Sequence, residues 1–328
     1  MVLPSLEFLL SSAAAGAALA LLSMGITLTY MTTRVSNFAH ATMAIIGAVT
    51  TLLLLDRFFA GLRDSPLYYT LFLVSPLLAA VVTGAVAVIM YVTTIRPLIK
   101  KGTGLIGLMI ATLAFDIILN NLLTLFLQLT PAQTVGRLLE ANVKGYLVPV
   151  SIPLVGYMYP HRLFLPILAL LVGIGLHLFL TRTQFGISMR ASIENPQLAR
   201  IIGINVERVY LVSWFLSGAT AGMAGSLLAF EMPGISPAAA YLYIVSIFAG
   251  SIVGGLNSIY GALAGGFLVG SMEAIVPVFI SDVYQLVTGE YIDLLRYQRM
   301  FSFLLLILVL LVAPEGLAGI KWRGIRRG

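Results

Sequence analysis

Nine runs of apolar residues, most of them long enough to cross a lipid bilayer, constrain the fold of this chain more than any other feature. A helix needs about 20 such residues to span the hydrocarbon core. Only 10% of the 328 residues are charged, whereas roughly a quarter are charged in soluble domains. The runs fall at 6–31, 38–55, 69–92, 105–129, 162–180, 209–230, 241–255, 259–280 and 297–313. The sequence therefore predicts an all-α polytopic membrane protein of about nine transmembrane helices, folded as a single transmembrane domain over residues 1–328.

Two of the nine runs are weaker candidates for a straight crossing. The run at 241–255 is short, and the run at 297–313 has a core of only about 14 strongly apolar residues. Because either helix would then be tilted, broken or re-entrant, the expected number of crossings ranges from eight to ten. No Lys or Arg precedes Arg34, so the first run lacks the positive start of a signal peptide and is expected to be retained.

The distribution of cations predicts the orientation, because cytoplasmic segments of membrane proteins carry an excess of Lys and Arg. With nine crossings and the C-terminus inside, the inner segments hold 12 cations and three acids, and the outer segments hold seven cations and eight acids. We therefore expect a multi-pass protein of the plasma (cytoplasmic) membrane, with its N-terminus outside. The basic tail at 314–328 would lie in the cytoplasm as a topology anchor.

Several classes of chemistry are excluded by what the sequence lacks. The chain has no cysteine, which excludes disulfides, thiolate metal sites and cysteine nucleophiles. Its net charge of +6 follows from the inner cations, so no nucleic-acid partner is expected. No Gly-x-x-x-x-Gly-Lys-Ser/Thr phosphate loop occurs. We expect no catalytic residue, no metal site and no cofactor, and any ATP hydrolysis must come from partner proteins.

A polar face interrupts the run at 105–129. Thr112, Asp116 and Asn120 recur every four residues and so lie along one side of a helix, with Asn121 beside them. Because polar groups are costly in hydrocarbon, this face must point at protein or water. The pattern indicates either the lining of a translocation pathway or an interhelical hydrogen-bond cluster, and the sequence leaves both open.

Two more ionisable residues lie within apolar runs. Glu273 precedes Pro277 by four residues, and a proline inside a helix removes a backbone donor and is expected to kink it. A paired structural carboxylate and a residue of the pathway both fit Glu273. His40 has no His, Asp or Glu neighbour at ligand spacing, so a hydrogen-bonded packing role is favoured over a ligand or proton relay.

Glycines recur four residues apart in several apolar runs, a spacing that lets two helices approach closely. The pairs are Gly218 and Gly222, Gly250 and Gly254, Gly261 and Gly265, and Gly266 and Gly270. The segment 254–258, Gly-Gly-Leu-Asn-Ser, is too rich in glycine and polar residues to continue a helix, so it predicts a tight turn or a helix break. Broken helices often line transport pathways, which makes Asn257 a candidate pathway residue.

The loop at 181–208 is the longest inner segment, and it predicts a short amphipathic helix of about two turns. Asn195 is a favourable N-cap, Pro196 suits the first helical position, and Gly203 suits the position after the helix. The apolar stripe of this helix and the charges beside it are made by Leu198, Ile201 and Ile202 with Arg190, Glu194 and Arg200. So short a helix is unstable alone and must dock onto its own membrane domain, the lipid surface or a partner.

Four stretches, in the same order and over nearly the whole chain, are similar to motifs of one family of transport proteins. The segment 36–40, Ser-Asn-Phe-Ala-His, resembles a motif of an H-type subunit, and 313–317 resembles a terminal Pro-x-Gly-Leu motif. The stretch 254–266 resembles a glycine-rich motif in which Gly-Leu-Asn-Ser replaces the usual Gly-Ile-Gly-Ser. The matching loop positions are Gly186, Arg190, Ala191, Glu194, Asn195, Ala199, Gly203, Ile204 and Asn205. Together they resemble the permeases of branched-chain amino acid ABC transporters (Liv type, H-like subunit).

That resemblance implies a membrane-spanning permease subunit of an ATP-binding-cassette importer for branched-chain or aliphatic amino acids. Its implied partners are cytoplasmic ABC ATPase subunits, a second permease subunit as a hetero- or homodimer, and an extracytoplasmic solute-binding protein on the outer loop at 130–161. Close relatives carry urea, short amides or another small polar solute, which leaves the substrate open. The segment 194–203 would be the coupling helix in a groove of the ATPase, and the implied coupling residues are Arg190, Glu194, Asn195, Leu198, Ile201, Ile202 and Gly203.

Candidates for the translocation pathway, or for an intramembrane polar network, are Asn37, His40, Thr112, Asp116, Asn120, Asn121, Asn257 and Glu273. Two functions of other classes make different predictions. A proton-coupled secondary transporter, using Asp116, Glu273 or His40, would take up solute without ATPase subunits and would depend on the proton gradient. A passive channel would show flux without saturation and without dependence on ATP.

Overall fold

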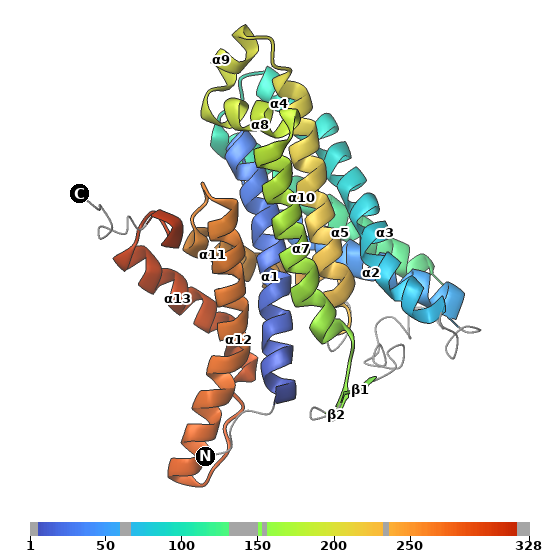
Figure 1. Ribbon diagram of the computed structural model, residues 1–328, viewed down its shortest axis with the longest axis vertical. Coiled ribbons are helices and arrows are strands. Elements are labelled where there is room, and N and C mark those ends of the chain that lie inside the picture. The colour runs from blue at the N-terminus through green and yellow to red at the C-terminus, as the bar shows by residue number, and fades with distance from the viewer. Residues whose placement is uncertain (1–5, 60–66, 131–149, 153–155, 232–235, 320–328) are drawn as a thin grey trace.

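A computed structural model describes residues 6–59, 67–130, 150–152, 156–231 and 236–319, and these residues are almost all helical, as predicted (Figure 1). Among the described residues, seven helices are long and apolar enough to cross a membrane, and two apolar helices, at 40–56 and 239–254, are shorter. All nine lie where the apolar runs predict them. They are α1 (Leu6–Thr33), α2 (His40–Phe59), α3 (Leu67–Met90), α5 (Leu105–Leu129), α7 (His161–Arg182), α10 (Val206–Leu228), α11 (Ala239–Gly254), α12 (Ile259–Thr288) and α13 (Gln298–Val312).

The sequence did not anticipate how α3 ends. A five-residue π-helix, η1 (Tyr91–Ile95), follows it directly, and α4 (Arg96–Lys100) continues the same helical segment with Pro97 in its first turn. Single π-turns within helices are frequent at functional sites. The segment therefore projects beyond the apolar run and carries Arg96 and Lys100 at its tip.

The helix α1 lies at the centre of the bundle, where it packs against α12, α10, α7 and α11 (Figure 1). Small residues permit these contacts, as the four-residue glycine spacing predicts. A Cβ added at Gly266 of α12 would lie 2.6 Å from the carbonyl oxygen of Leu19, and one added at Gly270 would lie 2.7 Å from that of Ala15. Helix α12 itself is continuous through Pro277.

A still tighter approach joins α10 to α2 and supports a stability prediction. A Cβ added at Gly225 would lie 1.8 Å from the carbonyl oxygen of Ala44, a backbone atom that cannot rotate away. We expect Gly225→Ala to lower the free energy of unfolding by about 1–3 kcal/mol, measured by unfolding of the purified protein in detergent. Gly175→Ala in α7 is the matched control, because an added Cβ there meets nothing within 4 Å and alanine favours a helix. Equal losses in both variants would contradict close packing at Gly225.

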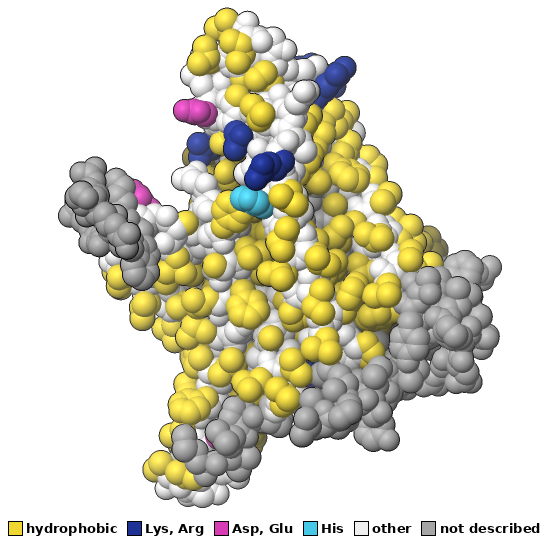
Figure 2. Space-filling view, in the orientation of Figure 1, with side chains coloured by type: hydrophobic (Ala, Val, Ile, Leu, Met, Phe, Trp, Pro, Cys, Tyr) yellow, Lys and Arg dark blue, Asp and Glu magenta, His cyan; other side chains and the backbone are white. Residues whose placement is uncertain are grey.

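The two ends of the bundle differ. Strand β1 (Val150–Ile152) pairs antiparallel with β2 (Gly156–Met158), with Val150 opposite Met158. This hairpin lies at the end of the bundle opposite α9 (Pro196–Ile201) (Figure 1). Residues 131–149 and 153–155 of the predicted outer loop, and 320–328 of the predicted tail, lie outside the described residues. On the face drawn in Figure 2, Lys and Arg side chains gather towards the α9 end, above a broad apolar surface.

The segment 183–203 contains two helices where the sequence predicted one. Helix α8 (Gln184–Glu194) is capped by Thr183, whose hydroxyl accepts a hydrogen bond of 2.9 Å from the backbone nitrogen of Gly186. Helix α9 (Pro196–Ile201) follows directly. The segment 194–203 is therefore not one helix, because Glu194 ends α8, Asn195 separates the two helices and α9 covers residues 196–201.

Candidate functional site

The polar face of α5 is buried. Thr112, Asp116 and Asn120 are 0%, 4% and 7% exposed. The Asp116 carboxylate accepts a hydrogen bond of 2.5 Å from the hydroxyl of Thr42 in α2, and the Asn120 amide donates one of 2.9 Å to the carbonyl oxygen of Pro237. The face therefore connects α5 with α2 and with the segment that leads into α11.

Thr112 extends these connections to the turn between α1 and α2. Its hydroxyl accepts a hydrogen bond of 3.2 Å from the backbone nitrogen of Phe38 and lies 3.2 Å from the carbonyl oxygen of Ser36. Asn121 has a different environment, because it is exposed and donates a hydrogen bond of 2.7 Å to Ile117 of its own helix. Asn121 is therefore not part of the hydrogen-bonded network that its three neighbours form.

Asn37 and His40 lie at the turn that begins α2, and both side chains are fully buried. The Asn37 side-chain oxygen accepts a hydrogen bond of 3.0 Å from the backbone nitrogen of Ala39. The His40 ring lies 3.4 Å from the Ser217 hydroxyl of α10 and against Gly25 of α1, where an added Cβ would come within 2.6 Å of it. These contacts fit a packing histidine, and within the described ranges no group of three potential ligands could hold a metal ion.

Glu273 of α12 is paired with Arg299 of α13. Its carboxylate accepts hydrogen bonds from the Arg299 guanidinium and from the hydroxyls of Ser246 and Ser302. The guanidinium also lies over the Tyr243 ring, with its central carbon 4.3 Å from the ring centroid. Of the two interpretations left open for Glu273, a paired structural carboxylate matches this geometry. Arg299 was not among the residues predicted from the sequence, although a cation inside the apolar run at 297–313 was the available signal.

The segment 254–258 forms the predicted tight turn between α11 and α12. Gly255 has a φ of 104°, a region that other residues rarely adopt. The hydroxyl of Ser258 accepts a hydrogen bond of 3.0 Å from the backbone nitrogen of Gly261 and caps α12.

This turn brings distant parts of the sequence together. Asn257 accepts a hydrogen bond of 3.0 Å from the guanidinium of Arg34, which follows α1. Gly316 lies so close that a Cβ added there would be 2.6 Å from the Cα of Gly255. The glycine-rich stretch and the terminal Pro-x-Gly-Leu stretch are therefore in contact.

The short helix α9 is capped as the sequence predicts. The Asn195 side-chain oxygen accepts hydrogen bonds of 3.0 Å from the backbone nitrogens of Gln197 and Leu198. Pro196 is the first residue of the helix, and Gly203 follows its end with a φ of 87°. Helix formation is thus specified locally, although so short a helix needs other contacts for stability.

The apolar stripe of α9 faces away from the rest of the chain. Leu198, Ile201 and Ile202 are 56%, 81% and 66% exposed, whereas Ala199 is 1% exposed and lies against the chain's own structure. Exposed charged side chains flank the stripe, namely Arg190 and Glu194 of α8 and Arg200 of α9. An exposed apolar stripe ringed by charges is typical of a helix that binds in a groove.

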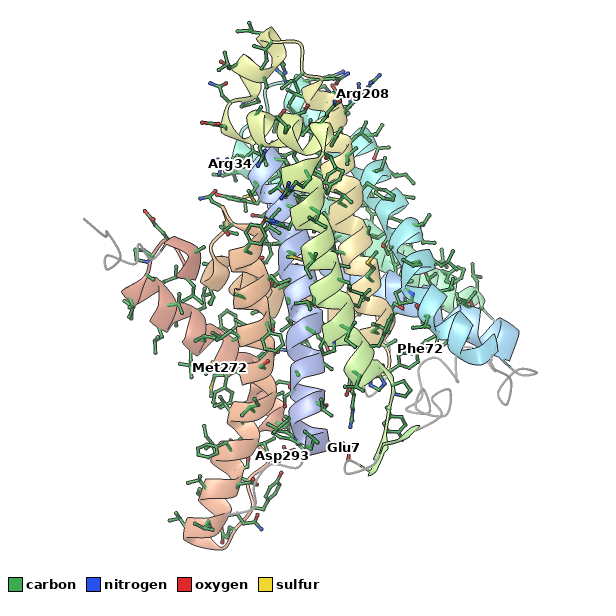
Figure 3. All side chains as sticks on the ribbon, viewed as in Figure 1. Glu7, Arg34, Phe72, Arg208, Met272 and Asp293 are labelled. Atoms are coloured by element: carbon green, nitrogen blue, oxygen red, sulfur yellow. The ribbon has the colours of Figure 1, made fainter. Side chains whose placement is uncertain are left out.

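Four charged residues mark the two ends of the bundle. Arg34 and Arg208 lie towards the α9 end, and Glu7 and Asp293 lie at the other end (Figure 3). Both labelled cations thus lie at the end that carries α9.

A second ion-pair cluster, which the sequence reasoning missed, lies near the hairpin. The carboxylate of Glu231 is 2.8 Å from the His161 ring and accepts a hydrogen bond of 3.0 Å from Arg162. Arg162 also pairs with Glu7 at 2.6 Å. The cluster ties the residues after α10 to the first turns of α7 and α1.

The Glu231 cluster predicts a dependence of stability on pH. Burial alone would raise the pKa of the Glu231 carboxyl, but hydrogen bonds and charges from His161 and Arg162 outweigh it and hold the pKa below its ordinary value of 4.5. The stabilisation is therefore complete above pH 4.5 and is lost as the pH falls through the folded-state pKa. We expect Glu231→Gln to cost about 1–3 kcal/mol at neutral pH and less in acid, measured by thermal unfolding at several pH values. A cost that stays constant in acid would contradict this account.

Comparison with known proteins agrees with the family that the sequence motifs resemble. A family model described as "Branched-chain amino acid transport system / permease component" matches residues 8–310. The chain is 40% identical over 310 residues to the probable branched-chain amino acid transport permease protein LivH of Methanocaldococcus jannaschii, covering 94% of this chain and 91% of that protein. It is 29% identical over 315 residues to the high-affinity branched-chain amino acid transport system permease protein BraD of Pseudomonas aeruginosa, covering 96% and 95%. It is 27% identical over 306 residues to the high-affinity permease protein LivH of Escherichia coli, covering 93% and 92%.

Proposed function

Because the chain belongs to the family of permease components of branched-chain amino acid transport systems, we propose that it is the membrane-spanning permease subunit of an ATP-binding-cassette importer. Residues 1–328 form one permease domain, which forms the pathway for branched-chain or other aliphatic amino acids. The subunit is not an enzyme, and cytoplasmic ABC ATPases supply the hydrolysis of ATP. A second permease subunit, either a copy of this chain or a related one, completes the pathway.

The α9 end of the bundle faces the cytoplasm in this proposal, and the hairpin end faces outwards. The asymmetry of charge supports it, because the segments assigned to the inside hold 12 cations and three acids. The N-terminus then lies outside, the C-terminus lies in the cytoplasm, and the solute-binding protein docks on the outer loop at 130–161.

Labelling of single cysteines tests this orientation, because the chain has no cysteine of its own. Ile201→Cys on α9 and Glu290→Cys after α12 are both exposed positions. In intact cells, a thiol reagent that does not cross the membrane is expected to label Cys at 290 and to label Cys at 201 only after the membrane is opened. Labelling of position 201 in intact cells would reverse the orientation.

Coupling to the ATPase is carried in this proposal by the exposed apolar stripe of α9. The stripe enters a groove of the ATPase, and Arg190 and Glu194 of α8 contact its rim. Helix α8 packs on α7, α10 and α1, and α9 contacts α10, so a displacement of α9 reaches the centre of the bundle. Alternating access follows as a shift in the populations of the inward-facing and outward-facing conformations. This shift requires that the ATP-bound and ATP-free ATPases contact α9 differently.

The intramembrane polar groups position helices in this proposal rather than bind substrate. Thr112, Asp116 and Asn120 are almost fully buried and bond to other segments of the same chain. Glu273 is likewise satisfied by an arginine and two hydroxyls. Asn121 remains the pathway candidate on α5, because its side chain is exposed.

Reconstitution into liposomes tests the proposed function. The chain alone should not accumulate labelled leucine, and the chain with its ATPases, second permease and binding protein should do so only with ATP. Excess isoleucine should compete, whereas urea and acetamide should not. Uptake by the chain alone that follows a proton gradient would replace this proposal with a secondary transporter, and flux without saturation would replace it with a channel.

A further inference from the structure

A cavity of about 580 Å³ opens at the α9 end, between the tip of the α3–α4 segment and the start of α10. Its volume is within the range of roughly 300–1,000 Å³ that is usual for small-ligand sites. None of the three stripe residues and no residue of the polar network of α5 lines it, although Arg200 beside the stripe and Gly203 after α9 do. The side chains that give the cavity its chemistry are those of Tyr91, Arg96, Lys100, Arg200, Glu207 and Tyr210.

The charges that line the cavity are unbalanced. Arg96 forms an ion pair with Glu207. Lys100 and Arg200 are both exposed, and within the described parts of the chain no carboxylate forms an ion pair with either of them. Two uncompensated cations facing one cavity repel each other and attract an anion.

The rest of the lining suits a phosphate group. Tyr91 and Tyr210 pack edge to face, with ring centroids 6.5 Å apart, and each hydroxyl is a hydrogen-bond donor. Arginine matches the oxygens of a phosphate with its planar fork of donors, and lysine binds the same group as a point charge. A phosphate monoester carries a charge of about −1.5 to −2 at neutral pH, which fits two free cations, whereas one carboxylate would leave a cation uncompensated.

We propose that this cavity binds a phosphate monoester or inorganic phosphate between Lys100 and Arg200. The first residue ends the segment that extends α3, and the second belongs to α9, so the bound group holds the two segments together. Occupancy therefore limits the movement of α9. The group reaches the site either as the headgroup of a lipid such as phosphatidic acid or as a soluble phosphate.

Binding to the isolated full-length chain tests the proposal without any transport measurement. The protein is placed in phosphatidylcholine nanodiscs, and inorganic phosphate is titrated by calorimetry. In parallel, phosphatidic acid is added to the bilayer, and its saturable protection of the protein against thermal unfolding is measured. Saturation by phosphate identifies a soluble source, and saturation by phosphatidic acid alone identifies a lipid source. We expect Lys100→Gln and Arg200→Gln each to weaken the binding about tenfold.

Arg208→Gln is the matched control, because Arg208 is an exposed cation of the same end of the molecule that does not line the cavity. It should bind both probes as the parent does. Absence of saturable binding for both probes would overturn the proposal. An equal loss of binding in Lys100→Gln, Arg200→Gln and Arg208→Gln would also overturn it. Loss of ATPase co-purification in Lys100→Gln and Arg200→Gln, with no binding of either probe, would assign the cavity to the ATPase contact instead. Because binding is measured on this chain alone, its failure is distinct from failure of the importer assignment.

Discussion

Replacing Arg299 by glutamine is expected to lower the free energy of unfolding by about 3–5 kcal/mol, which is among the largest effects in this protein. The variant leaves the carboxylate of Glu273, which is only 4% exposed, without its cationic partner. The hydroxyls of Ser246 and Ser302 still donate to it, but two neutral donors do not compensate a buried charge. Unfolding of the purified protein in detergent measures the loss.

Arg296→Gln provides the matched control for this prediction. Arg296 is 82% exposed and pairs with Asp293 at 3.2 Å, and exposed ion pairs contribute about 0–1 kcal/mol. Adding Glu273→Gln to the Arg299→Gln chain should recover much of the lost stability, because no charge then remains buried. A loss in Arg299→Gln no greater than in Arg296→Gln would mean that Glu273 is stable without its partner. Glu273 would then again be a candidate proton carrier.

Placing a carboxylate in the stripe of α9 is expected to weaken ATPase binding by about a hundredfold or more. The reason is that Ile201→Glu would bury an unpaired charge in the proposed groove. Because Ile201 is 81% exposed in this chain, the same substitution should leave membrane insertion and thermal stability unchanged. Co-purification of the ATPase subunits with the tagged variant measures the binding.

Ile201→Val tests whether the lost property is the apolar surface itself. It keeps the stripe apolar, so it should retain nearly the full amount of co-purified ATPase. If Ile201→Glu retained the ATPase as well as Ile201→Val does, then α9 would not be the coupling element. A loss of stability in Ile201→Glu would instead show that the stripe packs against the membrane domain.

The sequence predicted most of the fold because the signals for it are local. Long apolar runs fix where membrane helices lie, Asn195 and Pro196 fix the start of α9, and the run of glycine and polar residues at 254–258 fixes a turn. Helix α8 was missed although Thr183 is a favourable N-cap, because Gly186 near its start lowers the intrinsic helix propensity of the segment. The π-helix after α3 was missed because no residue pattern distinguishes it from the α-helix that it extends.

The candidate site was predictable where its polar residues lie on one face of a single helix. The spacing of Thr112, Asp116 and Asn120 indicated a buried face on α5, which the structure contains. Pairing across distant segments was not predictable, because it depends on how the helices pack. Arg299 lies near the start of the apolar run at 297–313, and nothing in the sequence pairs it with Glu273, yet the packing of α13 on α12 brings the two together.

Crosslinking from α9 tests whether this helix joins the permease to an ATPase. The chain has no cysteine, so a photoreactive thiol reagent can be attached at Ile201→Cys alone, in membranes that contain the whole transporter. Leu311→Cys on α13, which is 80% exposed, serves as the comparison. The account predicts that the position on α9 crosslinks to the ATPase subunit, that ATP changes the yield, and that the position on α13 does not. Crosslinks from α9 only to lipid or to its own chain would contradict it.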